Sequence, residues 1–374
     1  MKQPLHPLYF WLVGLTAACW SACTTEVDLD ALRKAPKLVL NSRLAAGDTV
    51  SARVTRTWFY TDNRPDILLP AAEVGLYVNG QWKERMTWQP GDARYGPQGC
   101  FLSSYRAAPG DRLRIEASHP EYEKTWAEVT VPEASPLVDI QLSRHTMSYP
   151  HQTLVRTDYD VTLRDDPARK NYYLLELEEG YLLDSVSSSG PVYSWISVAL
   201  DFSRDPVFED QATALDKFFG HDGSSYAGGR VFTDALFNGK DYVLKMSSSY
   251  YIYHSDGGYD NGYDNGYGNG YGEQYGSRDA GREAANDGAG EEEIPMRLLR
   301  FRLYTLNESY YLYLRSLAAL EGSTFEGDMA ELGLTSPVRV YSNIEGGGTG
   351  IVAAYAAAAQ LISRFPEAEA SSPR

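Results

Sequence analysis

The chain has little cysteine, little histidine and fewer basic than acidic residues. Three of its 374 residues are cysteine and six are histidine. Cys19 and Cys23 lie close to the N-terminus. If Cys23 carries a lipid, Cys100 has no partner in the body of the chain, so a disulfide framework is excluded. The net charge of −16 argues against a nucleic-acid-binding protein, because phosphates require a basic face.

The N-terminal apolar stretch is too short to span a bilayer. Leu8–Ala18 is an apolar run of 11 residues, whereas a span needs about 20. A run of this length, after Lys2 and before small residues, is typical of a secretory signal. We therefore predict a lipoprotein signal peptide over residues 1–22 and lipidation at Cys23, where acyl chains would form a stable membrane anchor.

Two alternatives to this anchor stay open. Trp20 stands at position −3 from Cys23, where lipoprotein signals usually have Leu, and Cys19 is a rival site of lipidation. An ordinary secretory signal with two incidental cysteines is the other alternative. Residues 23–35 read as a polar tether with acidic residues, which favours lipid anchoring at the outer membrane with the protein exposed on the surface. The periplasmic face is left open.

Residues 36–133 carry the alternating apolar pattern of β-strands. Turn residues separate the runs, and Asn79-Gly80 is typical of a tight hairpin because both residues tolerate positive φ. Short strands at this spacing predict an N-terminal Ig-like antiparallel β-sandwich. The alternating runs are Lys37–Leu44, Val50–Val54, Val74–Val78, Leu113–Ala117 and Ala127–Val131.

Residues 134–366 predict a second, mainly β domain with one helix, followed by a C-terminal tail over 367–374. Val338 and Val340 predict a late strand within it. The whole chain is therefore expected to be mostly β. The alternating runs of the second domain are Tyr159–Leu163, Tyr173–Leu177, Tyr242–Met246 and Leu299–Leu303.

The single predicted helix covers about Asn307–Glu321. Thr305 and Glu308 have capping-box spacing, and Gly322 would end the helix. One apolar face would be made by Tyr310, Tyr313, Leu314 and Leu317.

Residues 256–293 interrupt the β pattern with a low-complexity insertion. Tyrosines recur every four residues among Gly, Asp and Asn, and the segment contains ten acidic residues and two basic ones. The glycine content excludes a stable helix, so we expect a disordered acidic Tyr/Gly loop. A calcium site and a contact surface for a partner are weaker alternatives, since the EF-hand spacing and the nonapeptide repeat are both missing.

The usual catalytic patterns are missing from the sequence. The histidines lack the i, i+4 pairing of a zinc-protease helix, and Gly223–Gly228 has one residue too many for a nucleophile elbow. Asp165 and Asp166 are adjacent in a turn, so they would point apart and could not flank one bond. We therefore predict no catalytic residue, no metal site and no cofactor, in a protein that is not an enzyme.

A glycine-rich segment near the C-terminus has two interpretations. Val338–Tyr341, the loop Gly346–Gly350 and a possible helix over Ile351–Ile362 resemble the opening of a dinucleotide fold. Only 24 residues follow Gly350, too few for the second strand that such a fold requires. We favour a tight turn that packs the C-terminus onto the second domain, with Asn343 and Glu345 hydrogen-bonding across it and forming a candidate binding site.

Ser342–Gly347, with Gly350 and Ile351 behind it, is the most specific motif of the chain. Together with other stretches between Cys23 and about Tyr355, it resembles a family of Bacteroidota lipoproteins catalogued as domain of unknown function 4249. The resemblance implies cell-envelope lipoproteins, often encoded beside TonB-dependent receptors, and it carries no catalytic residues. The other matching stretches are Cys23–Asp28, Ala72–Gly80, Phe232–Gly239 and Leu306–Tyr311.

The function expected from these features is that of a non-catalytic cell-envelope lipoprotein. It would serve as an accessory binding or lid component of a TonB-dependent outer-membrane uptake system, with the receptor as partner and an unknown ligand. A surface adhesin or structural module is the first alternative, and an envelope hydrolase is the second. Fold alone cannot decide between them.

Overall fold

The structure is a computed structural model of the whole chain. The predicted signal peptide, Cys23, the insertion over 256–293, Val338 and the Gly223–Gly228 stretch lie outside the described residues. In the described part, no helix is long and apolar enough to cross a bilayer. The structure describes residues 33–59, 61–63, 66–91, 99–184, 192–211, 231–253, 298–322, 339–363 and 369–370.

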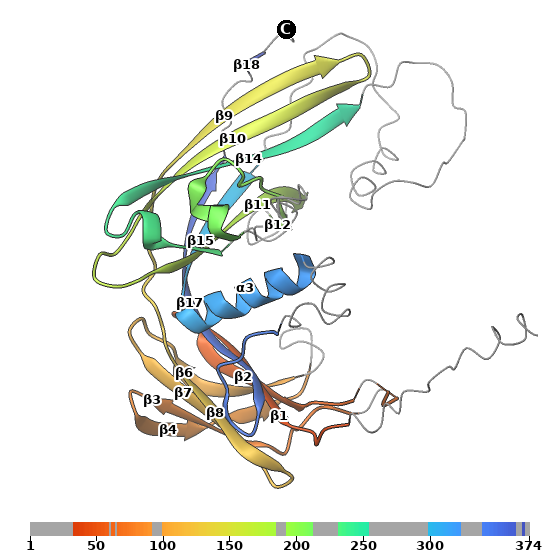
Figure 1. Cartoon of the computed structure of the whole chain (residues 1–374), viewed down its shortest axis with the longest axis vertical. Coiled ribbons are helices and arrows are strands. Elements are labelled where there is room, and N and C mark those ends of the chain that lie inside the picture. Colours follow the sequence, from red (N-terminus) through yellow and green to blue (C-terminus); the bar gives the residue numbers. More distant parts are fainter. Residues whose placement is uncertain are drawn as a thin grey trace, which may run out of the picture.

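Two stacked β-sandwiches share one long sheet (Figure 1). The shared sheet has nine strands and runs in the order β12-β11-β15-β17-β1-β2-β6-β5, with β13 paired to β11. Its strands are β1 (Leu38–Ala45), β2 (Thr49–Arg56), β5 (Thr87–Gln89), β6 (Cys100–Arg106), β11 (Tyr172–Asp184), β12 (Val192–Ser197), β13 (Val231–Thr233), β15 (Leu298–Leu306) and β17 (Thr349–Ile362).

A smaller sheet closes each sandwich. The first sandwich, lower in Figure 1, is closed by β3 (Glu73–Val78), β4 (Gln81–Arg85), β7 (Arg112–His119), β8 (Tyr122–Thr130) and β16 (Glu345–Gly346). The second is closed by β9 (Leu137–Tyr149), β10 (Gln152–Arg164), β14 (Asp241–Tyr253) and β18 (Glu369–Ala370). The described helices are α3 (Glu308–Gly322) and the short 3-10 helices η2 (Pro206–Gln211) and η3 (Asp234–Leu236).

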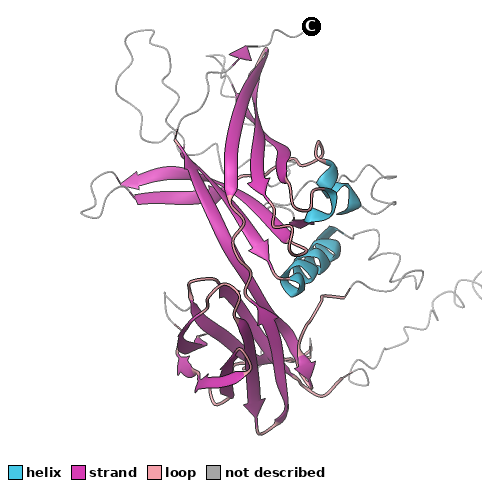
Figure 2. Ribbon diagram, turned by 90° about the vertical axis from the view of Figure 1, so that its left-hand side faces the viewer, coloured by secondary structure: helices cyan, strands magenta, loops and turns pink. Residues whose placement is uncertain are grey.

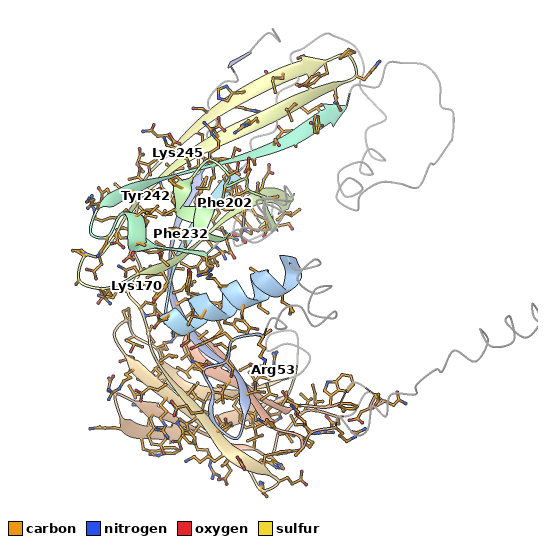
Figure 3. The ribbon with its side chains drawn as sticks, in the orientation of Figure 1. Arg53, Lys170, Phe202, Phe232, Tyr242 and Lys245 are labelled. Atoms are coloured by element: carbon orange, nitrogen blue, oxygen red, sulfur yellow. The ribbon has the colours of Figure 1, made fainter. Side chains whose placement is uncertain are left out.

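The predicted fold class is confirmed, because the described chain is mostly β with one α-helix and sandwich-like sheets. The alternating apolar residues of the predicted runs fill the first core, among them Leu40, Val54 and Ile115. Asn79 and Gly80 have φ of 53° and 81° and turn β3 into β4. In the second core, Phe202 and Phe232, labelled in Figure 3, pack beside the β10 and β14 side chains.

The possible helix over Ile351–Ile362 is wrong, because these residues belong to strand β17. From Thr349 to Tyr355 this strand pairs in parallel with β1, and from Tyr355 to Ile362 it pairs antiparallel with β15. The alanine-rich sequence favours a helix intrinsically. Backbone pairing with both neighbouring strands overrides that preference.

Strand β17 joins the two sandwiches. Val352 and Ala354 are fully buried in the first core, while Ile362 packs against the second. Part of the predicted second domain therefore completes the core of the first. The boundary between residues 133 and 134 stays a prediction.

Helix α3 begins one residue later than predicted, and its N-cap is not the predicted one. Asn307 caps the helix, since its Oδ1 accepts a hydrogen bond from the Tyr310 N–H at 3.2 Å. The predicted cap, Thr305, lies in β15 and accepts a hydrogen bond from the Ser135 N–H. Tyr311, which the predicted face omitted, is the buried aromatic residue of the helix.

The predicted strand at Val340 is also wrong, because this residue is exposed and outside any strand.

Candidate binding face

One side of the shared sheet combines paired charges with aromatic rings. Alternate residues of β11 and β15 point into the second core, and the others point to the side on which helix α3 packs. At the edge of α3 and beyond it, this side carries a set of exposed or partly exposed polar and aromatic residues. We call it the polar-aromatic face, and it consists of Arg43, Glu176, Glu178, Trp195, Arg300, Arg302, Tyr304, Tyr310 and Tyr355.

At the β12 end of this face, an ion-pair group lies against an indole ring. Glu178 Oε2 contacts Arg300 Nε at 2.6 Å and Arg302 Nε at 3.2 Å. The guanidinium of Arg300 lies 3.8 Å from the centre of the Trp195 ring. Glu178 and Arg300 are 17% and 20% exposed, so the surrounding protein screens this group less than bulk water would. The attraction within it is therefore stronger than in a fully exposed ion pair.

At the α3 end, tyrosines surround a carboxylate and an arginine. Burial raises the pKa of Glu176 above its usual range, while a hydrogen bond from Tyr304 opposes the shift. Burial also raises the pKa of Tyr304 to about 12. The Tyr355 ring lies 5.6 Å from that of Tyr304 and 5.9 Å from the Arg43 guanidinium. Partial desolvation of charged and phenolic groups in one place is typical of functional sites.

Three asparagines fix the strand that carries Tyr355. Asn41 Oδ1 accepts from the Ile351 N–H at 3.1 Å, and Asn307 Oδ1 accepts from the Ala354 N–H at 3.0 Å. Asn343 binds the residue between them, donating to the Val352 carbonyl at 2.8 Å and accepting from its N–H at 3.0 Å. These bonds position β17, and with it Tyr355, at the α3 end of the face.

The two residues predicted as a binding site are not part of the polar-aromatic face. Both ends of the Asn343 amide bind Val352, which gives this residue a structural contact. The Glu345 backbone pairs with Trp126 of β8 and accepts from the Thr125 hydroxyl at 2.9 Å, while its side chain is exposed. A ligand-binding role for either residue stays a prediction.

Glycines let the signature turn lie directly on β8. Gly346 has a φ of 84°, and a Cβ there would collide with the Lys124 carbonyl. A Cβ on Gly348 would collide with Thr125 and with the backbone of β1. The turn therefore requires glycine both for its backbone conformation and for the closeness of its neighbours.

Buried carboxylates outside the face hold loops together. Asp165 accepts from the Tyr173 hydroxyl at 2.6 Å, the Asn171 amide at 2.9 Å and the Gly239 N–H at 2.7 Å. Asp234 accepts from the Asn171 N–H at 2.7 Å, and burial raises the pKa of Asp234. Asp165 and Asp234 are 5% and 3% exposed, so this pair is closed to a substrate and occupied by internal donors.

The Asp166 and Asp165 side chains have different partners. Asp166 is half-exposed and pairs with Arg169 at 2.7 Å. Among the described residues, no group of three or more His, Cys, Asp or Glu side chains could hold a metal ion.

The sequence contained part of the signal for the polar-aromatic face. Arg300 and Arg302 alternate with buried residues of β15, which marks them as one side of a strand. Their partners, Glu178 on β11 and Trp195 on β12, are far away in the sequence. Only the pairing of the strands brings these residues together.

The fold and the face define a class of protein: a mostly β double sandwich with a partly exposed polar and aromatic surface on its shared sheet. The chain belongs to the family described as Domain of unknown function (DUF4249), whose model matches residues 24–360. The resemblance inferred from the sequence motifs is thereby confirmed at the level of the family. No curated protein gives a significant match.

Proposed function

We propose that the protein is a non-catalytic lipoprotein of the cell envelope, attached to the outer membrane through Cys23. It acts as an accessory binding or lid component of a TonB-dependent uptake system. The N-terminal sequence supports the anchor, and the family resemblance supports the partnership with a receptor.

The structural observation behind the binding role is the polar-aromatic face. Ligand sites combine aromatic surface with a few fixed polar groups. Here Trp195 and Tyr355 supply rings at the two ends, and Arg302 lies between them, paired with Glu178 at 3.2 Å. These groups are held on strands of the shared sheet, so little ordering entropy would be lost on binding.

Recovery of the native lipoprotein from solubilised outer membrane tests the partnership. After mild cross-linking, we expect a receptor barrel to be recovered with the wild type. A Cys23→Ser variant should be released from the membrane and should recover much less receptor. Recovery of the wild type without any receptor would contradict the proposed uptake role.

A thermal-stability screen of oligosaccharides and peptides tests the face. A ligand at 100 times its Kd stabilises the folded state by about 2.7 kcal/mol. We expect such a ligand to lose most of this effect with Arg302→Gln and Trp195→Ala. Trp82→Ala, which removes an exposed indole from the first sandwich, is the matched control. Ligands that stabilise all three variants as well as the wild type would show that the face does not bind them.

A further inference from the structure

The strands β9, β10 and β14 form a ribbon that projects from the second sandwich. Each strand has 13 residues, and β10 pairs along its length with both neighbours. All side chains that the ribbon gives to the second core come from 137–142, 159–163 and 242–246. The rest of the ribbon runs past the shared sheet (Figures 1 and 2). We call residues 143–157 and 247–252 the ribbon tip.

The ribbon tip exposes large apolar side chains. Tyr149, Tyr251 and Ile252 are 44%, 50% and 44% exposed. Met147 and Tyr251 flank Leu154 in one row across the three strands. This row, in which Tyr251 is exposed and the other two side chains are half-exposed, makes the end of the ribbon a candidate surface for a partner.

The ribbon tip is basic, although the chain as a whole is acidic. Residues 140–157 and 242–253 contain no Asp or Glu, in a chain of net charge −16. Asp158, at the base of the tip, is surrounded by Arg156 at 2.9 Å, Arg204 at 3.0 Å and His145 at 3.5 Å. One carboxylate therefore lies against two guanidinium groups and one imidazole, and the two arginines alone exceed its charge by one.

We propose that the ribbon tip binds an anionic lipid surface. Tyrosine rings suit the headgroup level of a bilayer, because the ring is apolar and the hydroxyl stays in water. Basic side chains close to them would lie at the level of the lipid phosphates, where each contributes attraction. This contact is separate from the acyl anchor proposed at Cys23, and it would fix the orientation of the protein on the membrane.

Sedimentation of the mature chain with vesicles tests this contact without the anchor. The protein carries Cys23→Ser, so it cannot be acylated. We expect binding to phosphatidylcholine vesicles that contain phosphatidylglycerol and several-fold weaker binding to phosphatidylcholine alone. Binding should fall further as salt rises from about 0.05 M to about 0.5 M, because salt screens surface charges. Equal binding to both vesicles, or none to either, would overturn the proposal.

Two variants separate the contribution of the apolar rings to vesicle binding from that of the basic side chains. Tyr149→Ser with Tyr251→Ser should lower binding roughly tenfold, because two rings leave the interface. Trp58→Ser with Trp82→Ser is the matched control, since these side chains are 47% and 56% exposed on the first sandwich. An equal loss in both double variants would contradict a specific role for the tip.

The basic contribution is tested by Arg156→Gln. In this variant Asp158 keeps Arg204 at 3.0 Å, so the tip is not left with an unpaired acid. We expect the preference for anionic vesicles to shrink while residual binding to neutral vesicles is unchanged. If the preference stays as in the wild type, or if the tip captures an acidic protein but no vesicle, the lipid surface is not its partner. Either result leaves the receptor partnership to be judged separately by cross-linking.

Discussion

Asn343 and Val352 are joined by two hydrogen bonds that use both ends of one amide. Nδ2 donates to the Val352 carbonyl at 2.8 Å, and Oδ1 accepts from the Val352 N–H at 3.0 Å. The side chain thus acts like a short piece of neighbouring strand beside β17. This contact gives a physical reason for Asn within the most specific motif of the chain.

Replacement of Asn343 by Ala should lower the free energy of unfolding by about 1–3 kcal/mol. The change leaves the backbone polar groups of Val352, a fully buried residue, without these partners. Urea denaturation measures the effect. Glu345→Ala is the neighbouring control, and its exposed side chain predicts a change within about 0.5 kcal/mol. Equal effects of the two substitutions would contradict the structural role of Asn343.

Gly346→Ala should be more destabilising than Gly47→Ala, although the two glycines have nearly the same φ. Their φ angles are 84° and 86°, but a Cβ on Gly47 has open space, whereas one on Gly346 meets the Lys124 carbonyl and Trp126. Backbone strain alone costs about 1–2 kcal/mol. Overpacking adds about 1–3 kcal/mol at Gly346. The two melting temperatures compare the contributions, and a similar decrease at both positions would contradict the close packing of the turn on β8.

Local patterns in the sequence predicted the strands but not how the two sandwiches share a sheet. Alternation at Leu299–Leu303 identifies β15, and Asn79-Gly80 identifies a hairpin, because both signals lie within a few residues. Strand β17 was not predicted as a strand because its alanines favour a helix, while its partner β1 lies about 310 residues earlier in the chain. The polar-aromatic face could not be predicted for the same reason, since its residues come from five strands and a helix.

Asp165→Ala should cost about 3 kcal/mol or more, and Asp166→Ala no more than about 1 kcal/mol. Asp165 accepts from Tyr173, Asn171 and Gly239, and each buried donor left unsatisfied costs about 1–3 kcal/mol. The Asp166 ion pair is exposed, and such pairs contribute little. Chemical denaturation of the two variants makes the comparison. Comparable losses would indicate that Asp165 is not the centre of a buried network.

Glu176→Gln should reduce the loss of stability that accompanies rising pH. Burial raises the pKa of Glu176 in the folded chain above its usual value of 4.5. The unfolded chain therefore releases this proton first as pH rises, and the folded state loses stability until its own raised pKa is passed. Gln cannot ionise, so the free energy of unfolding of the variant should rise relative to that of the wild type between about pH 4.5 and neutral pH.

Asp241→Asn is the control, because the pKa of Asp241 is shifted in the opposite direction to that of Glu176. The hydrogen bond from Arg164 lowers the pKa of Asp241 below its usual value of 3.8. This carboxylate therefore contributes stability above that value, and the contribution disappears as pH falls through the lowered pKa. Urea midpoints measured from pH 4 to pH 8 should show Glu176→Gln gaining on the wild type with rising pH and Asp241→Asn falling below it at neutral pH. Parallel curves for Glu176→Gln and the wild type would show that Glu176 is not desolvated, and would remove the electrostatic argument for the α3 end of the polar-aromatic face.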